Sequence, residues 1–133
     1  MKPKYIFDAG VIALYFSGDR RIKPYFDEVF NGEAEGYITE INLAEFYYKT
    51  AEKLGIETAN IRYKMIRKSE IKQILPKGEV SRKAAELKLK YKDKLSLADC
   101  FLISQAEDLN AAIVTTDHNI KQIAKNRAIY IKI

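Results

Sequence analysis

Hydrophobic and polar residues follow two patterns along the chain, short β-rich runs and longer stretches with helical spacing. The short runs predict strands at residues 4–8, 36–39, 70–75, 112–115 and 129–133. The helical spacing, with its turn and capping residues, predicts helices over residues 11–16, 20–30, 39–54, 57–69, 79–92, 96–109 and 118–125. One or two helices separate each strand from the next, which favours parallel pairing through right-handed crossovers. We therefore expect an α/β fold, a three-layer α/β/α sandwich with a central, mainly parallel sheet.

The length and composition restrict the class of protein. At 133 residues, 47% hydrophobic and 31% charged, the chain is expected to fold as one continuous domain over residues 1–133. Its longest unbroken apolar run, residues 11–16, is far shorter than the roughly 20 residues that cross a bilayer. The first residues also lack the apolar stretch of a signal peptide. We expect no membrane partner and a cytoplasmic location.

Cysteine and histidine are too scarce for several kinds of site. Cys100 is the only cysteine, so no internal disulfide can form. His118 is the only histidine, and the two residues alone cannot complete a zinc site.

The positive charge is concentrated in one segment. Residues 62–94 carry 12 Lys/Arg and 4 Asp/Glu, a net charge of +8, whereas residues 1–61 have a net charge of −3 and the whole chain +5. Such a block suits a nucleic-acid partner, because basic side chains release counterions from phosphates. The alternative is a solvated helix face. The candidate RNA-binding residues in the block are Arg62, Arg67, Lys68, Arg82 and Lys83.

Four carboxylates are expected at one edge of the sheet. Asp8 ends the first strand, and Asp117 directly follows the fourth. Asp99 lies in the first turn of the helix that Ser96 opens, and Glu45 lies in the second turn of the helix after the second strand. Ligands of open parallel sheets bind beyond the carboxyl ends of the strands, which is where these side chains are expected.

Three of the four acids also have a purely structural explanation. Asp117 can cap the helix that follows it, and Ser96 with Asp99 has the spacing of a capping box. Glu45 lies at the border of its helix's apolar arc, where glutamate is usually solvated. Together, however, four converging carboxylates would repel each other unless a cation neutralised them. Oxygen ligands of this kind suit Mg²⁺ or Mn²⁺.

The segments KYIFDAG, ITEINLAEF, LSLADCFLI and IVTTDHNI, taken in order, resemble the PIN-domain family of ribonucleases, most closely its short VapC-type toxins. The resemblance implies a metal-dependent endoribonuclease in which Asp8, Glu45, Asp99 and Asp117 are the catalytic residues and hold Mg²⁺ or Mn²⁺. It also implies an RNA substrate, a homodimer and a small antitoxin partner.

The resemblance extends to two supporting residues and fails at one place. Thr115 matches the family's hydroxyl residue two places before the last acid, and Asn119 matches a position that is often polar. Family members commonly place Ser, Thr or Asn close after the first aspartate, whereas Ala9 and Gly10 stand here. This difference implies reduced or altered activity.

Two other functions remain as alternatives. The first is a non-catalytic PIN-like module that binds RNA or protein. The second is a receiver-type signalling domain, which would need an acidic neighbour beside Asp8 and an aspartate closing the strand at residues 70–75. Neither is present, so the receiver is disfavoured.

Overall fold

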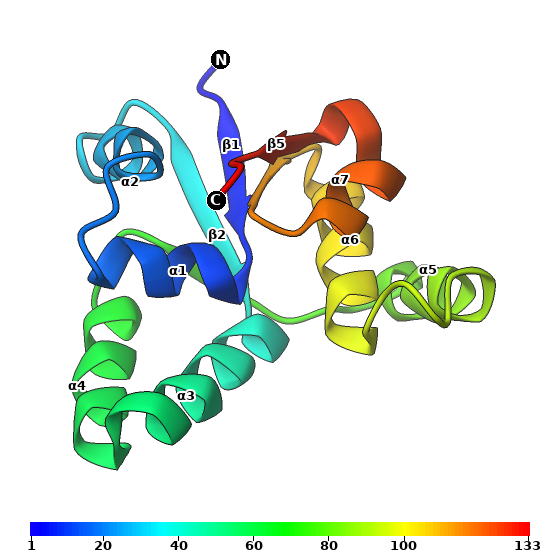
Figure 1. The fold of residues 1–133 in the computed structure, drawn as a ribbon. Helices are drawn as coiled ribbons and strands as arrows, with labels where there is room; N and C mark the ends of the chain where they lie inside the picture. Colours follow the sequence, from blue (N-terminus) through cyan, green and yellow to red (C-terminus); the bar gives the residue numbers. More distant parts are fainter.

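A single five-stranded parallel sheet organises the chain, whose residues 1–133 are all described by a computed structural model. The strands lie in the order β3-β2-β1-β4-β5 (Figure 1). Their bounds are β1 Lys4–Phe7, β2 Glu35–Thr39, β3 Lys72–Ile74, β4 Ala112–Thr115 and β5 Ala128–Tyr130. Every neighbouring pair is parallel, so all five carboxyl ends share one edge. The central strand β1 pairs with both β2 and β4, which brings the first and last thirds of the chain together.

Seven α-helices enclose this sheet in two layers (Figure 1). Those on one face are α1 Ala9–Phe16, α2 Lys23–Phe30, α3 Glu40–Leu54 and α4 Ile56–Arg67. Those on the other are α5 Glu79–Lys90, α6 Leu97–Leu109 and α7 His118–Ala124, and a short 3₁₀ turn, η1 Lys125–Arg127, leads into β5. The expected three-layer α/β/α architecture is confirmed, with a sheet that is parallel throughout. No helix is long and apolar enough to cross a membrane.

The alternation of side chains along β1 builds both hydrophobic layers. Tyr5 and Phe7 pack into one core with α1 to α4, whereas Ile6 between them packs into the other with α5 to α7. Successive residues of a strand point to opposite faces, so a strand buried on both sides must be apolar throughout. This explains why Tyr5, Ile6 and Phe7 precede Asp8, while the charged Lys4 stands at the partly exposed start of the strand.

Gly36 allows α2 to lie close against β2. A Cβ atom at this position would stand 2.8 Å and 2.9 Å from the two γ-carbons of Val29 on α2. Real Cβ atoms do not approach carbon so closely, so any larger residue would push the helix away from the sheet.

The observed elements follow the expected order and differ mainly at their ends. The helix expected from residue 20 begins at Lys23, because the Asp19 carboxylate accepts the Arg21 N–H and holds a turn ahead of Pro24 in the first helical turn. The strand expected over residues 70–75 shortens to Lys72–Ile74. There the Ser69 hydroxyl accepts the Ile71 N–H and bends the chain before the strand begins.

Candidate active site

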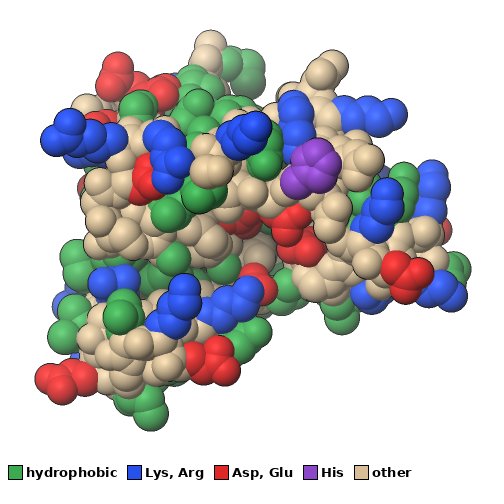
Figure 2. Space-filling view, in the orientation of Figure 1, with side chains coloured by type: hydrophobic (Ala, Val, Ile, Leu, Met, Phe, Trp, Pro, Cys, Tyr) green, Lys and Arg blue, Asp and Glu red, His purple; other side chains and the backbone are tan.

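Acidic side chains gather in a hollow beyond the carboxyl ends of the strands. Figure 2 shows Asp and Glu side chains deep in this hollow, Lys and Arg side chains around its rim, and the single histidine beside it. The four acids singled out in the sequence all lie at this edge of the sheet, on the connections that leave β1, β2 and β4 and at the start of α6.

Asp8 occupies the most buried position of the four. It follows the last residue of β1, caps α1, and is only 7% exposed. Its Oδ1 accepts the Val11 N–H at 2.8 Å, and its Oδ2 accepts a hydrogen bond from the Thr115 hydroxyl. Burial raises the pKa of Asp8 to about 6 against the lowering effect of these two donors, and the charges of Asp117 and Asp99 raise it further.

Thr115, the last residue of β4, joins two of the acids. Its hydroxyl donates to Asp8 and accepts the Asp117 N–H at 3.0 Å. Asp117 Oδ1 accepts the N–H groups of Asn119 and Ile120, at 2.7 Å and 3.2 Å, and so caps α7 as its position in the sequence suggested. Asp117 Oδ2 has no hydrogen-bond partner in the chain and is free for a ligand.

Asp99 is also both a helix cap and a member of the acidic group. The Ser96 hydroxyl accepts the Asp99 N–H, and Asp99 Oδ2 accepts the Ser96 N–H, both at 3.1 Å, which completes the capping box. Burial raises the pKa of Asp99 against the effect of the Ser96 bonds, and the charges of Asp117 and Glu45 raise it further. Asp99 therefore caps α6 and at the same time interacts electrostatically with Asp117 and Glu45.

Glu45 is held in place by neighbours on α3 and its side chain is only 21% exposed, unlike a solvated border residue. The Asn42 amide donates to Glu45 Oε1 at 3.3 Å, while Asn42 Oδ1 accepts the Thr39 hydroxyl at 2.7 Å. On the other side, Lys49 Nζ lies 3.2 Å from Glu45 Oε2. Glu45 is thus oriented by an amide and neutralised by an ammonium group. Neither partner was predicted from the sequence, although residues at i,i+3 and i,i+4 on a helix are neighbours and this spacing indicates such contacts.

The chemistry of these side chains fits a divalent cation. They supply carboxylate oxygens, the preferred ligands of Mg²⁺ and Mn²⁺. Neighbouring carboxylate charges help to raise the pKa of Asp8 and of Asp99, and a bound cation would oppose this effect. As the side chains stand, no three Asp, Glu, His or Cys groups meet closely enough to enclose an ion. Asp8, Glu45, Asp99 and Asp117 are the residues that could hold one. Asn119 is directed elsewhere, because its side-chain amide donates to the Lys94 carbonyl at 3.1 Å.

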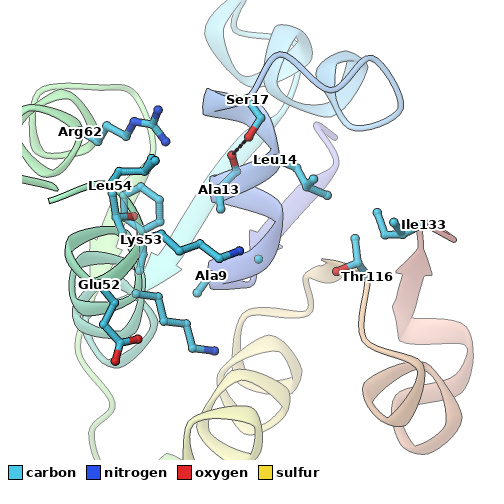
Figure 3. Close-up of a pocket in the computed structure, with 14 residues that line it drawn as sticks. Ala9, Ala13, Leu14, Ser17, Glu52, Lys53, Leu54, Arg62, Thr116 and Ile133 are labelled. Carbon is cyan, nitrogen blue, oxygen red and sulfur yellow. Dashed lines mark hydrogen bonds between the residues drawn. The ribbon is translucent and has the colours of Figure 1, made fainter. Parts of the chain in front are cut away.

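A groove of about 640 Å³ runs between α1 and α3 and reaches the acids at Gly10. A Cβ atom at Gly10 would lie 3.5 Å from both Asp8 Oδ1 and Thr116 Oγ1, so the groove adjoins the Asp8 carboxylate at this residue. Figure 3 shows Lys53 reaching from α3 toward α1, and Arg62 on α4 near the far end. The lining residues are Ala9, Gly10, Ala13, Leu14, Ser17, Phe46, Lys49, Thr50, Glu52, Lys53, Leu54, Arg62, Thr116 and Ile133.

Comparison with known proteins identifies the family. A family model described as the PIN domain matches residues 5–126. The chain belongs to the PIN-domain family. A comparison with curated protein sequences finds no match.

Solved structures share the fold of this PIN domain. VapBC2 from Rickettsia felis, bound to a DNA fragment from its promoter, has a TM-score of 0.75 at 17% identity, over 96% of this chain and 97% of that one. DNA-bound VapBC from Salmonella typhimurium has a TM-score of 0.74 at 15% identity, over 96% and 98%. VapC20 of Mycobacterium tuberculosis, a toxin that cleaves the sarcin-ricin loop, has a TM-score of 0.71 at 12% identity, over 90% and 94%.

The basic block of this PIN domain divides between two helices on opposite faces of the sheet. On α4, the Arg62 guanidinium lies 5.1 Å from the ring centroid of Phe16 and has no acidic partner. Lys68, which ends α4, is exposed and also makes no ion pair. Arg67 pairs with Glu40 and donates to the Tyr63 hydroxyl.

The remaining two candidates lie on α5 in the other layer. Arg82 pairs with Glu79 and Glu86, whereas Lys83 is exposed and unpaired. The +8 segment is therefore not one continuous surface, and only its α4 part adjoins the groove.

Proposed function

We propose that this PIN domain is a metal-dependent endoribonuclease that hydrolyses RNA phosphodiester bonds, with residues 1–133 forming one nuclease domain. The observation that supports the proposal is that Asp8, Glu45, Asp99 and Asp117 all lie at the same edge of the sheet. They come from separate parts of the chain, and the Asp8 and Asp99 carboxyls respond to the charges of the others. Such costly repulsion is typical of a site built for cations.

Each catalytic side chain has a neighbour that holds its orientation. Asp8, Asp99 and Asp117 would bind Mg²⁺ or Mn²⁺, and Glu45 would bind the ion or orient the attacking water. When bound, the ion supplies positive charge at the phosphate and lowers the pKa of water. Thr115 fixes Asp8, the Ser96 capping box fixes Asp99, and Asn42 fixes Glu45, in keeping with the importance of such outer contacts for metal sites.

The groove and α4 offer charges for the RNA backbone. Arg62 and Lys68 are without acidic partners, so their charges are available to phosphates. Arg67 is already neutralised by Glu40, and Arg82 by two glutamates. We therefore rank Arg62 and Lys68 above Arg67 and Arg82 as phosphate ligands. Lys83 is unpaired as well, but it ranks lower because it lies on α5, in the other layer from the groove.

The biological role that we propose is that of the toxin in a toxin-antitoxin pair in the cytoplasm. The support is the fold shared over nearly the whole chain with VapBC complexes and VapC20. On this proposal the chain forms a homodimer and binds a small antitoxin protein.

Cleavage of a labelled RNA by the purified protein tests the assignment. We expect cleavage with Mn²⁺ or Mg²⁺, none with EDTA, and a loss of at least about 100-fold for Asp99→Asn. Glu107→Gln, which changes an exposed acid on the same helix, is the matched control and should cut like the wild type. Equal cleavage by wild type and Asp99→Asn would show that the acids do not catalyse the reaction.

A non-catalytic RNA- or protein-binding module is the second candidate, favoured by Gly10. The family commonly has a polar side chain close after the first aspartate, and position 10 offers none beside Asp8. A protein that cuts no RNA and whose melting temperature does not rise with millimolar Mg²⁺ or Mn²⁺ would support the binder.

A further inference from the structure

Lys49 is a basic residue placed within the acidic site itself. It lies one helical turn after Glu45 on α3, with its Nζ 3.2 Å from Glu45 Oε2. Its side chain is 56% exposed and lines the groove, so the ammonium group contacts an acid of the site and is also open to solvent. Partial burial acts to lower the pKa of Lys49, but the Glu45 ion pair and the charges of Tyr48 and Asp99 outweigh it and raise the pKa.

Lys53 provides a direct comparison on the same helix. It lies one turn further along α3, lines the same groove and has no acidic partner. The difference between the two lysines is that only Lys49 contacts an acid of the site.

We propose that Lys49 is the resident counter-cation of the acidic site, which a divalent cation must displace from Glu45 in order to bind. The inference rests on the proposed function. An ammonium group and a divalent ion need the same carboxylate oxygens, and the two positive charges repel each other at that distance. The flexible four-carbon stem lets the ammonium group move into the groove at little cost. Loading the site would thus add a free positive charge to the groove beside the acids.

Mn²⁺ binding by calorimetry separates this role from a merely structural one. Lys49→Met should lower the Kd for Mn²⁺ by about two- to fivefold, because no competing ion pair has to be broken. The same variant should lower the melting temperature of the metal-free protein by a few degrees, since Glu45 and Asp99 lose their neutralising charge. Lys53→Met should leave both quantities close to wild type. Unchanged or weaker Mn²⁺ binding by Lys49→Met would overturn the proposal.

A double-mutant cycle with Glu45 tests whether Lys49 affects Mn²⁺ binding through its ion pair with Glu45. In a Glu45→Gln background the ion pair is absent, so adding Lys49→Met should change the Kd for Mn²⁺ by less than about 1.5-fold. A full two- to fivefold gain in Mn²⁺ affinity in that background would mean that Lys49 acts only as a distant positive charge. The proposal that Mn²⁺ displaces Lys49 from Glu45 would then be wrong.

The failure of this inference differs from the failure of the proposed function. If the wild type binds no Mn²⁺ and cuts no RNA, both fail together. If the wild type binds Mn²⁺ and cuts RNA while Lys49→Met binds no more tightly, only the role of Lys49 is overturned.

Discussion

The hydroxyl of Thr115 donates a hydrogen bond to the carboxylate of Asp8, although 107 residues separate them in the chain. The contact crosses from β4 to the end of β1, the two strands that pair in the middle of the sheet. Since the same hydroxyl accepts the Asp117 N–H, it sets the distance between the first and last acids of the site. The position of these acids therefore depends on strand pairing rather than on a mobile loop.

Replacing Thr115 by valine should damage the site while keeping the shape of the side chain. Asp8 would lose a donor and the Asp117 N–H its acceptor, so we expect activity to fall about 10- to 100-fold. The free energy of unfolding should fall by about 1 to 3 kcal/mol. RNA cleavage assays and urea denaturation measure the two effects. Thr115→Ser keeps the hydroxyl and is the control, and equal losses in both variants would show that packing, not the hydrogen bond, is responsible.

Asp8→Asn should abolish activity and yet stabilise the metal-free protein above pH 6. The pKa of Asp8 is raised from 3.8 to about 6, so the folded state binds this proton more tightly than the unfolded chain does. The wild type therefore loses stability as the pH rises from about 4 to 6, and the loss persists at higher pH.

Denaturation in EDTA at several pH values measures this effect. At pH 7.5 the variant should be more stable by roughly 2 to 3 kcal/mol, and at pH 4 the difference should vanish. Asp93→Asn, at an exposed position, is the control. A gain that is the same at both pH values would contradict the electrostatic explanation.

Arg62 and Arg82 should contribute unequally to RNA binding. Arg62→Ala removes an unpaired charge beside the groove, and should weaken binding and reduce the slope of log K against log salt by about one unit. Arg82→Ala removes a charge already paired with two glutamates and should change little. Fluorescence anisotropy with labelled RNA, in an Asp99→Asn background that prevents cleavage, measures both. Equal losses would show that both helices contact RNA.

Two glycines should respond in opposite directions to alanine. At Gly36 a Cβ atom would stand 2.8 Å from Val29, so Gly36→Ala should destabilise the fold by about 1 to 3 kcal/mol. At Gly10, in α1, the nearest atoms are 3.5 Å away, and Gly10→Ala should stabilise it by up to about 1 kcal/mol. Thermal denaturation compares the two, and a stabilised Gly36→Ala would show that α2 is not tightly packed on the sheet.

Local patterns in the sequence were sufficient for the order of elements and for the choice of acids. The last three residues of β1, Tyr5 to Phe7, are hydrophobic because they are buried on both faces of the sheet, and Asp8 directly after them marks the edge of the sheet. Capping and candidate catalysis were treated as competing explanations for Asp99 and Asp117. The structure places both side chains in caps and in the acidic group at once, because helices that begin at this edge direct their first residues toward it.

Other features depended on the three-dimensional path of the chain. The net charge of residues 62–94 can be counted from the sequence, but the crossover after β3 sends α5 to the opposite face from α4, which no local pattern specifies. Asn119 lies in a position that suggested the site, yet its amide donates to the Lys94 carbonyl, a partner from another loop. Neither the placement of α5 nor the hydrogen bond of Asn119 leaves a periodic signal in the sequence.

The placement of β1 between β2 and β4 also has a consequence for synthesis on the ribosome. Asp8 leaves the exit tunnel early, but Thr115, which bonds to it, lies 107 positions later in the chain. A nascent chain that has been translated only as far as Asp99 still lacks the fourth acid, Asp117. On the proposed function, the domain becomes an active nuclease only after the ribosome has passed Asp117 and this residue has joined Asp8 at the sheet edge.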